Sequence, residues 1–269
     1  MLSDLNWKGG ISLATIETDT NYSMQELLKE DFWRERFPEL SICHYLANSS
    51  VGEINLSPQS VARIDDRIIK DGYFQEKDKE LEELALLIGR MVKRCISLNI
   101  PPPFLFLFDE PWGCFYRLHP VLKHLLGDSY CILPDFWIWH VDHNKEESGW
   151  GPHRDKGRSS LKPDGTPLSL TVWIPLSEAM PLNGCMYMLP ACRDPVYNTM
   201  DEDTSQFDLP AVRALPAKPG DWLCWNQAVL HWGSQSSDYA PHERMSMALE
   251  FQRGDIPAFN KPLLTPLSN

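Results

Sequence analysis

The sequence lacks several features that mark well-known classes of protein. Basic residues are not in excess, because Lys and Arg number 25 against 37 for Asp and Glu, and the formal net charge is −12. Such an acidic chain repels a phosphate backbone, which argues against nucleic acid as a main partner. The 7 cysteines include no Cys-x-x-Cys pair, so we expect reduced thiols rather than a disulfide framework or a structural zinc site.

Long apolar runs are missing as well. The densest one, PPPFLFLF at 101–108, is too short to span a bilayer. The first ten residues, MLSDLNWKGG, have neither the basic nor the apolar region of a secretion signal. We therefore expect a cytoplasmic protein that makes no membrane contact. An apolar fraction of 43% with 10 Trp indicates a sizeable folded core.

The first part of the chain has the pattern of helices. Ser23 and Glu26 have the spacing of a capping box, and apolar residues recur at helical spacing after them. Three prolines at 101–103 would stop a longer amphipathic segment, and Gly127 would end a shorter one. We expect helices over 24–37, 79–100 and about 116–126.

From about residue 130 onward the pattern changes to short segments rich in aromatic and β-branched residues. Turn sequences such as KPDGTP and PLNG separate them. Many short strands of this kind indicate a sandwich or jelly roll. The sequence therefore predicts a mainly β protein with flanking helices. We expect a helical part (1–129) to pack on a β core (130–269) within one integrated domain. We expect strands over 130–143, 168–176, 184–190, 221–234 and 244–252.

The stretch SGWGPHRDKGRSS contains a candidate metal site. His153 and Asp155 lie two positions apart, and in an extended segment such residues point the same way. One further His on a later strand would complete a 2-His-1-carboxylate site, which suits Fe(II) and leaves coordination positions open. His231 in DWLCWNQAVLHWGS, 78 positions after His153, supplies the expected third ligand.

Two polar residues follow on the last predicted strand, in ERMSMALEF. If the co-substrate is 2-oxoglutarate, its distal carboxylate lies buried away from the metal and needs a cationic partner. Arg244 offers the planar, two-pronged fit that Lys cannot provide. Ser246 lies two residues on, faces the same way and can donate its hydroxyl to the same group.

The order of these motifs resembles the phytanoyl-CoA dioxygenase-like family of Fe(II)/2-oxoglutarate oxygenases over roughly residues 130–252. The resemblance also includes NGCMYMLP and the aromatic strand before it. It implies a double-stranded β-helix (jelly-roll) core with flanking helices. By the same resemblance, Arg244 anchors 2-oxoglutarate, Trp173 lies beside this cofactor and Ser246 is a second contact. The implied iron ligands are His153, Asp155 and His231.

The reaction implied by the resemblance uses Fe(II), 2-oxoglutarate and O2 and releases succinate and CO2. It hydroxylates a small-molecule substrate or oxidises it in another way that begins with C–H abstraction. Because Asp155 is present where related halogenases have a small residue, hydroxylation is favoured over halogenation. Two alternatives stay open: a zinc hydrolase on the same three residues, which leaves Arg244 and Ser246 without a role, and a non-catalytic jelly-roll binding module.

Basic residues around the predicted metal ligands allow two interpretations. They form either a solvated loop or an electropositive lip that attracts an anionic substrate. The acidic stretch at 200–208 is a solvated loop whose position would also fit a lid. The basic residues are Arg154, Lys156, Arg158 and Lys162.

Overall fold

The computed structural model describes residues 21–42, 52–145, 150–201, 203–205 and 207–264. The first ten residues and Cys43 lie outside these ranges, and all six cysteines inside them are free thiols. None of the described helices combines the length and apolar character needed to cross a bilayer.

Helices come mostly before residue 127 and strands mostly after 130, as the sequence predicts. The helices are α2 (Met24–Leu27), α3 (Glu30–Arg36), α4 (Pro58–Lys70), α5 (Lys79–Ser97), α6 (Asp109–Arg117) and α7 (His119–Leu126). The strands are β1 (Tyr73–Lys77), β2 (Cys131–Val141), β3 (Ser169–Pro175), β4 (Met186–Met188), β5 (Arg213–Leu215), β6 (Asp221–Asn226), β7 (His231–Gly233) and β8 (Arg244–Gln252). Short 3-10 turns span Pro102–Leu107, His143–Lys145, Gly157–Ser160, Pro181–Asn183, Ala191–Arg193 and Leu209–Ala211.

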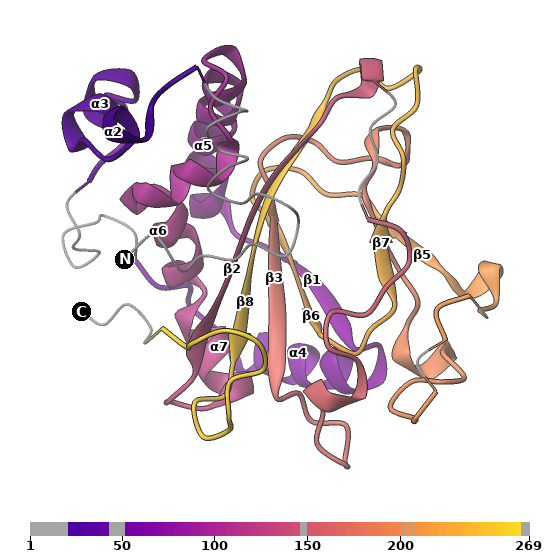
Figure 1. Cartoon of the computed structure of the whole chain (residues 1–269). Coiled ribbons are helices and arrows are strands. Elements are labelled where there is room, and N and C mark those ends of the chain that lie inside the picture. Colours follow the sequence, from indigo (N-terminus) through magenta and orange to yellow (C-terminus); the bar gives the residue numbers. More distant parts are fainter. Residues whose placement is uncertain (1–20, 43–51, 146–149, 202, 206, 265–269) are drawn as a thin grey trace.

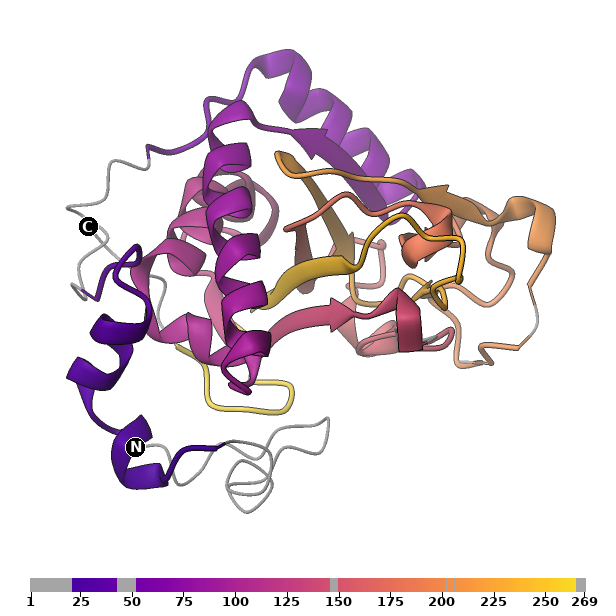
Figure 2. The same ribbon diagram turned by 90° about the horizontal axis from the view of Figure 1, so that it is seen from above.

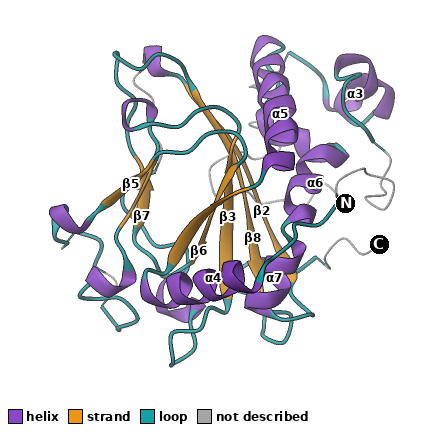
Figure 3. Ribbon diagram, turned by 180° about the vertical axis from the view of Figure 1, so that it is seen from behind, coloured by secondary structure: helices purple, strands orange, loops and turns teal. Residues whose placement is uncertain are grey.

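The strands form two antiparallel sheets. The major sheet has the order β1-β6-β3-β8-β2, and the minor sheet has the order β5-β4-β7. The helices lie on one side of the major sheet and the minor sheet on the other (Figures 1 and 2). Seen from behind, α4 and α7 lie in front of the lower ends of the strands (Figure 3). This is the predicted double-stranded β-helix with flanking helices.

Strand β8 shows how one sequence serves both sides of the major sheet. Its residues alternate between faces, as in any strand. Met245, Met247, Leu249 and Phe251 join the large apolar core shared with the helices. Ala248 belongs instead to the cluster between the two sheets. The same side of β8 carries Arg244 and Ser246, so both predicted polar residues face the minor sheet rather than the helices.

Two predicted helices are each divided in the structure. Ser23 caps α2 and forms the capping box with Glu26, but α2 ends at Leu27. The break lets the indole of Trp33 donate to the carbonyl of Leu27 over 2.8 Å. The segment around 116–126 belongs to two helices, α6 and α7, and the second is followed by Gly127 with φ +91°.

The prediction of one continuous strand over 221–234 is wrong. The chain turns after β6, where Asn226 accepts hydrogen bonds from Ala228 through its side chain and from Val229 through its carbonyl. It then enters the minor sheet as β7, so His231 begins a strand rather than ending one.

Three elements of the structure were not predicted from the sequence. Helix α4 has only a narrow apolar stripe, although Ser57 caps it and Pro58 opens it. Strand β1 lies at the edge of the major sheet, paired with β6, and β5 lies at the edge of the minor sheet. The division of the chain after residue 129 stays a prediction, and β1 shows that the segment before it contributes a strand to the major sheet.

Candidate metal and co-substrate site

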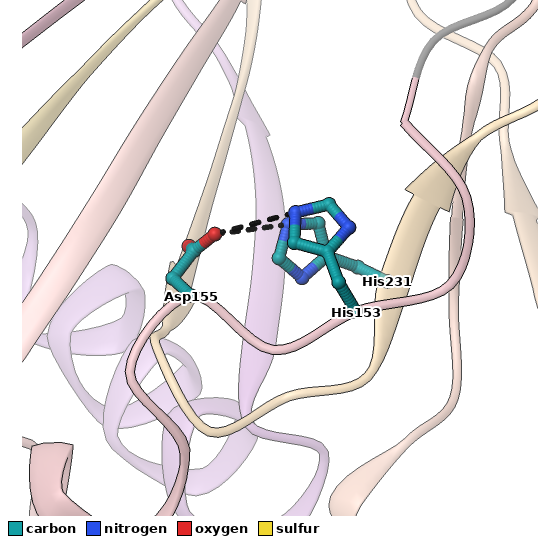
Figure 4. Close-up of side chains that lie close together, drawn as sticks. All are labelled: His153, Asp155 and His231. Atoms are coloured by element: carbon teal, nitrogen blue, oxygen red, sulfur yellow. Dashed lines mark ion pairs between the residues drawn. The ribbon is translucent and has the colours of Figure 1, made fainter. Parts of the chain in front are cut away.

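Three side chains that lie far apart in the sequence converge in the space between the two sheets. The backbones of His153 and His231 pair directly, each N–H donating to the other's carbonyl over 3.0 Å. The Nε2 atoms of both rings lie 3.5 Å from Oδ1 of Asp155 (Figure 4). All three candidate ligand atoms lie within 4.8 Å of one another. The predicted triad is therefore assembled, although His153 and Asp155 lie in a loop rather than a regular strand.

Both imidazole rings are held in the orientation that metal binding needs. Nδ1 of His153 lies 2.7 Å from the carbonyl of Gly151, and Nδ1 of His231 lies 3.0 Å from that of Val229. Because a carbonyl can only accept, each Nδ1 carries the hydrogen in these bonds. The Nε2 lone pairs are thereby left for a cation, the arrangement found around metal-binding histidines.

The two oxygens of Asp155 have different surroundings. Oδ2 accepts hydrogen bonds from the hydroxyl of Thr171 over 2.8 Å and from the indole Nε1 of Trp225 over 3.0 Å. Thr171 on β3 and Trp225 on β6 are paired across the major sheet, so the sheet register places both donors. Oδ1 is left facing the two histidines.

The protonation states also suit a divalent metal. Burial by itself would raise the pKa of Asp155, but His231, His153 and the Thr171 hydroxyl outweigh it and hold the pKa well below its usual range. Burial lowers the pKa of His231. For His153 burial acts in the same direction, but the hydrogen bond and charge of Asp155 prevail and raise its pKa. A carboxylate beside a neutral, buried imidazole is a donor set that fits Fe(II).

Arg244 is a buried cation in the same region. Only 2% of the residue is exposed. Its Nε donates to the carbonyl of Gly184 over 3.1 Å, and its Nη1 donates to the Ser246 hydroxyl over 2.7 Å. Burial lowers its pKa to about 10, so the side chain stays protonated at neutral pH. Among the described residues no carboxylate pairs with it, which fits an anionic ligand such as 2-oxoglutarate.

The Asn-Gly-Cys motif supports Arg244 through its glycine. Gly184 has φ +88°, and a Cβ at this position would lie 2.6 Å from the carbonyl oxygen of Ser234. A larger residue at position 184 would therefore shift the local backbone, and with it the Gly184 carbonyl that accepts from Arg244. Asn183, fully buried before it, accepts from the Met180 N–H and so fixes the turn.

The triad and Arg244 line one cavity of about 340 Å3 between the two sheets. Trp173 lines it too, opposite Ala248 of β8 and Leu223 of β6. Ser246 reaches the site through its bond to Arg244. The six predicted residues are thus brought together. Sequence reasoning missed Thr171 and Trp225, whose alternation with Trp173 and Leu223 could have identified them, and the carbonyls of Gly151, Val229 and Gly184, which have no side-chain signal.

The basic residues do not form a continuous exposed lip. Arg154 is buried and pairs with Asp194 over 2.7 Å. Lys156 pairs with Glu250 over 2.9 Å, and both side chains are largely buried. The lip prediction is therefore wrong for these two residues, whose ion pairs tie the metal-binding loop to its neighbours. Arg158 is exposed and Lys162 is half-buried.

Comparison with known proteins gives a match to a family and a match to a fold. The model of a family described as Phytanoyl-CoA dioxygenase (PhyH) matches residues 54–240. No curated protein matches the sequence.

Solved structures with a similar fold include the epimerase SnoN of nogalamycin biosynthesis, in complex with Fe3+, alpha ketoglutarate and nogalamycin RO. It has a TM-score of 0.52 and 15% identity, over 79% of this chain and 97% of that chain. EctD from S. alaskensis, with 2-oxoglutarate and 5-hydroxyectoine, has a TM-score of 0.52 and 14% identity, over 82% and 85%. AviO1 from Streptomyces viridochromogenes Tue57 has a TM-score of 0.55 and 13% identity, over 75% and 99%. At such low identity these similarities establish the fold.

Proposed function

The chain belongs to the phytanoyl-CoA dioxygenase family of non-haem iron, 2-oxoglutarate-dependent oxygenases, and from this we propose that it hydroxylates a C–H bond of a small-molecule substrate. Its cofactors are iron and 2-oxoglutarate. When bound, they supply the oxidising chemistry from O2 and release succinate and CO2. Another oxidation that begins with C–H abstraction would use the same residues.

Each residue of the site has a separate role in this proposal. His153, Asp155 and His231 hold iron on one side and leave the other side open, with Thr171 and Trp225 orienting the carboxylate. Arg244 pairs with the distal carboxylate of 2-oxoglutarate, and Ser246 orients Arg244. Trp173 gives the cofactor an apolar wall and helps to exclude water.

One observation supports the proposal most strongly. Arg244 is buried in the same cavity as the triad, and no carboxylate among the described residues pairs with it. A buried guanidinium is costly unless an anion compensates it. A zinc hydrolase on the same three ligands would leave this charge without a purpose. A binding module without catalysis would account for neither the charge nor the two fixed histidine tautomers.

Metal binding and turnover test the proposal together. Purified without oxygen, the protein should bind about one Fe(II) per chain, as expected for one facial triad, and should form succinate from 2-oxoglutarate once O2 is admitted. Asp155→Ala and His231→Ala should lose tight iron binding. His124→Ala, which alters an exposed histidine on α7 that pairs with Asp65, is the matched control and should retain it. Wild-type iron affinity in both site variants would refute the assignment, and hydrolysis with zinc but without 2-oxoglutarate would favour the hydrolase.

A further inference from the structure

Three tryptophans form a wall of the cavity next to the metal ligands. Trp137 and Trp139 on β2 are stacked, with ring centroids 5.3 Å apart and planes 7° apart. Trp150 lies edge-to-face with both, and its ring centroid is 5.6 Å from that of His153. All three line the cavity, and 46% of Trp150 is exposed. We call these residues the tryptophan wall. It offers aromatic surface beside the position where the substrate must react.

The charged groups near this wall are already neutralised in pairs. Glu250 pairs with Lys156 over 2.9 Å. Asp135, which also lines the cavity, pairs with Lys261. Arg154 is paired as well, through Asp194. Each of these charges therefore already has an opposite charge beside it, and a charged substrate group would be buried here without a counter-charge of its own, which is costly.

One acceptor stays available at this wall. The Oε2 atom of Glu250 binds Lys156, while Oε1 has no hydrogen-bond partner among the described residues. Glu250 is only 7% exposed and lines the cavity, so the free oxygen is accessible from within it. Trp137 lies opposite Ala248, two residues from Glu250 on the same face of β8. One small molecule can reach both, since such diagonal neighbours are about 7–8 Å apart.

The electrostatics of Glu250 also favour a hydrogen-bond donor here. Burial and the neighbouring Asp155 carboxylate raise its pKa to about 7, against the opposing effect of Lys156. A ligand hydroxyl or N–H that donates to Oε1 would stabilise the carboxylate. The cavity volume of about 340 Å3 is near the lower end of the range for small-molecule sites, roughly 300–1,000 Å3. With 2-oxoglutarate in place, the remaining room suits a compact group.

From these contacts we infer that the primary substrate is an uncharged, ring-bearing small molecule. Its ring packs on the tryptophan wall, and its hydroxyl or N–H group donates to Oε1 of Glu250. This inference rests on the proposed function, because it commits Arg244 to 2-oxoglutarate and the triad to iron.

Four probes with one ring and different polar ends test the inference. They are 2-phenylethanol, phenylacetate, 2-phenylethylammonium and the methyl ether of 2-phenylethanol. Each is titrated calorimetrically, without oxygen, into protein loaded with Fe(II) and 2-oxoglutarate. The affinity for the neutral alcohol should be at least about tenfold higher than that for either ion, because burying an unpaired ion is costly. The alcohol should also bind severalfold more tightly than the ether, which keeps the ring but cannot donate to Glu250.

A protein variant tests the ring contact. Trp150→Ala removes one ring of the tryptophan wall at a half-exposed position, and it should weaken the binding of 2-phenylethanol severalfold. Tyr239→Ala is the control, because it removes an aromatic side chain that is 86% exposed and does not line the cavity. The affinity of this variant for 2-phenylethanol should equal that of the wild type.

The outcomes separate this inference from the proposed function. The charge-transfer band of the Fe(II)–2-oxoglutarate complex, recorded before any probe is added, reports the cofactors alone. If the band forms but phenylacetate or the ammonium binds as tightly as the alcohol, the uncharged-substrate inference is overturned. Equal affinity for the ether and the alcohol overturns the Glu250 contact, and unchanged affinity in Trp150→Ala overturns the wall contact. If the band never forms, the proposed function itself fails.

Discussion

The two faces of the major sheet are built from the same strands but have opposite purposes. On the face towards the helices, β8 contributes Met245, Met247, Leu249 and Phe251 to a continuous apolar core. On the face towards the minor sheet, the alternate residues are polar or small, and Arg244, Ala248 and Glu250 among them line a cavity. Side chains on the helix face stabilise the packing of the strands. The strands in turn position the side chains on the cavity face. Burial alone does not distinguish the faces, since every residue of β8 is buried.

The comparison predicts that a change on the cavity face alters binding and that a change on the helix face alters stability. The largest effect is expected for Arg244→Ala. It leaves the distal carboxylate of 2-oxoglutarate buried without its partner, a cost of roughly 3–5 kcal/mol, or about a hundredfold to several thousandfold in affinity. The measurement is a titration of 2-oxoglutarate into the oxygen-free Fe(II) protein, followed through the charge-transfer band.

Two observations accompany this prediction. Arg244→Lys should recover only part of the affinity, because an ammonium cannot reproduce the paired fork. Iron binding should persist in both variants, since Arg244 is not a ligand in the proposal. Wild-type affinity for 2-oxoglutarate in Arg244→Ala would remove the main support for this co-substrate site.

On the opposite face, Leu249→Ala should act on folding. Leu249 is fully buried in the core beneath the helices. Its truncation should destabilise the protein by about 2–5 kcal/mol, through lost burial and the cavity left behind. Urea unfolding measures this loss. The folded fraction should bind iron and 2-oxoglutarate as the wild type does, and a strong drop in either affinity would show that the two faces are not independent.

Much of this division can be predicted from the sequence. The alternation in ERMSMALEF identifies β8 and its polar face, and the residue types of His153, Asp155 and His231 identify the triad. Such predictions work because a strand repeats every two residues and because few side chains bind iron.

The remainder depends on distant or backbone contacts. The partner of Lys156 is Glu250, 94 positions away, so the sequence cannot show that this lysine is paired. The turn after Asn226 moves the chain from one sheet to the other within an apolar segment that reads as one strand. The acceptors that fix the histidine rings are backbone carbonyls, which any residue carries.

A smaller effect, again on the cavity face, is expected for Thr171→Val. The change keeps the shape of the side chain but removes the hydroxyl that donates to Asp155. Loss of such a partner of a metal ligand typically weakens metal binding by about 10- to 100-fold. Val172→Ala is the matched control, because Val172 belongs to the core on the helix face. It should lower stability but leave the iron affinity, measured by competition with a chelator, unchanged. Equal iron affinities in the two variants would contradict the role assigned to Thr171.

The smallest effect is expected for Ser246→Ala. The hydroxyl of Ser246 accepts a hydrogen bond from Nη1 of Arg244 and is completely buried. Without 2-oxoglutarate, its removal leaves Nη1 without this acceptor. It also leaves the guanidinium without the contact that orients it towards the distal carboxylate, so 2-oxoglutarate should bind less tightly by about 1 kcal/mol, or roughly fivefold. The same titration as for Arg244→Ala measures it. Because a ligand stabilises the folded state according to its affinity, saturating 2-oxoglutarate should widen the difference in thermal stability between Ser246→Ala and the wild type. If that difference stays the same, Ser246 stabilises the fold without orienting Arg244 for its ligand.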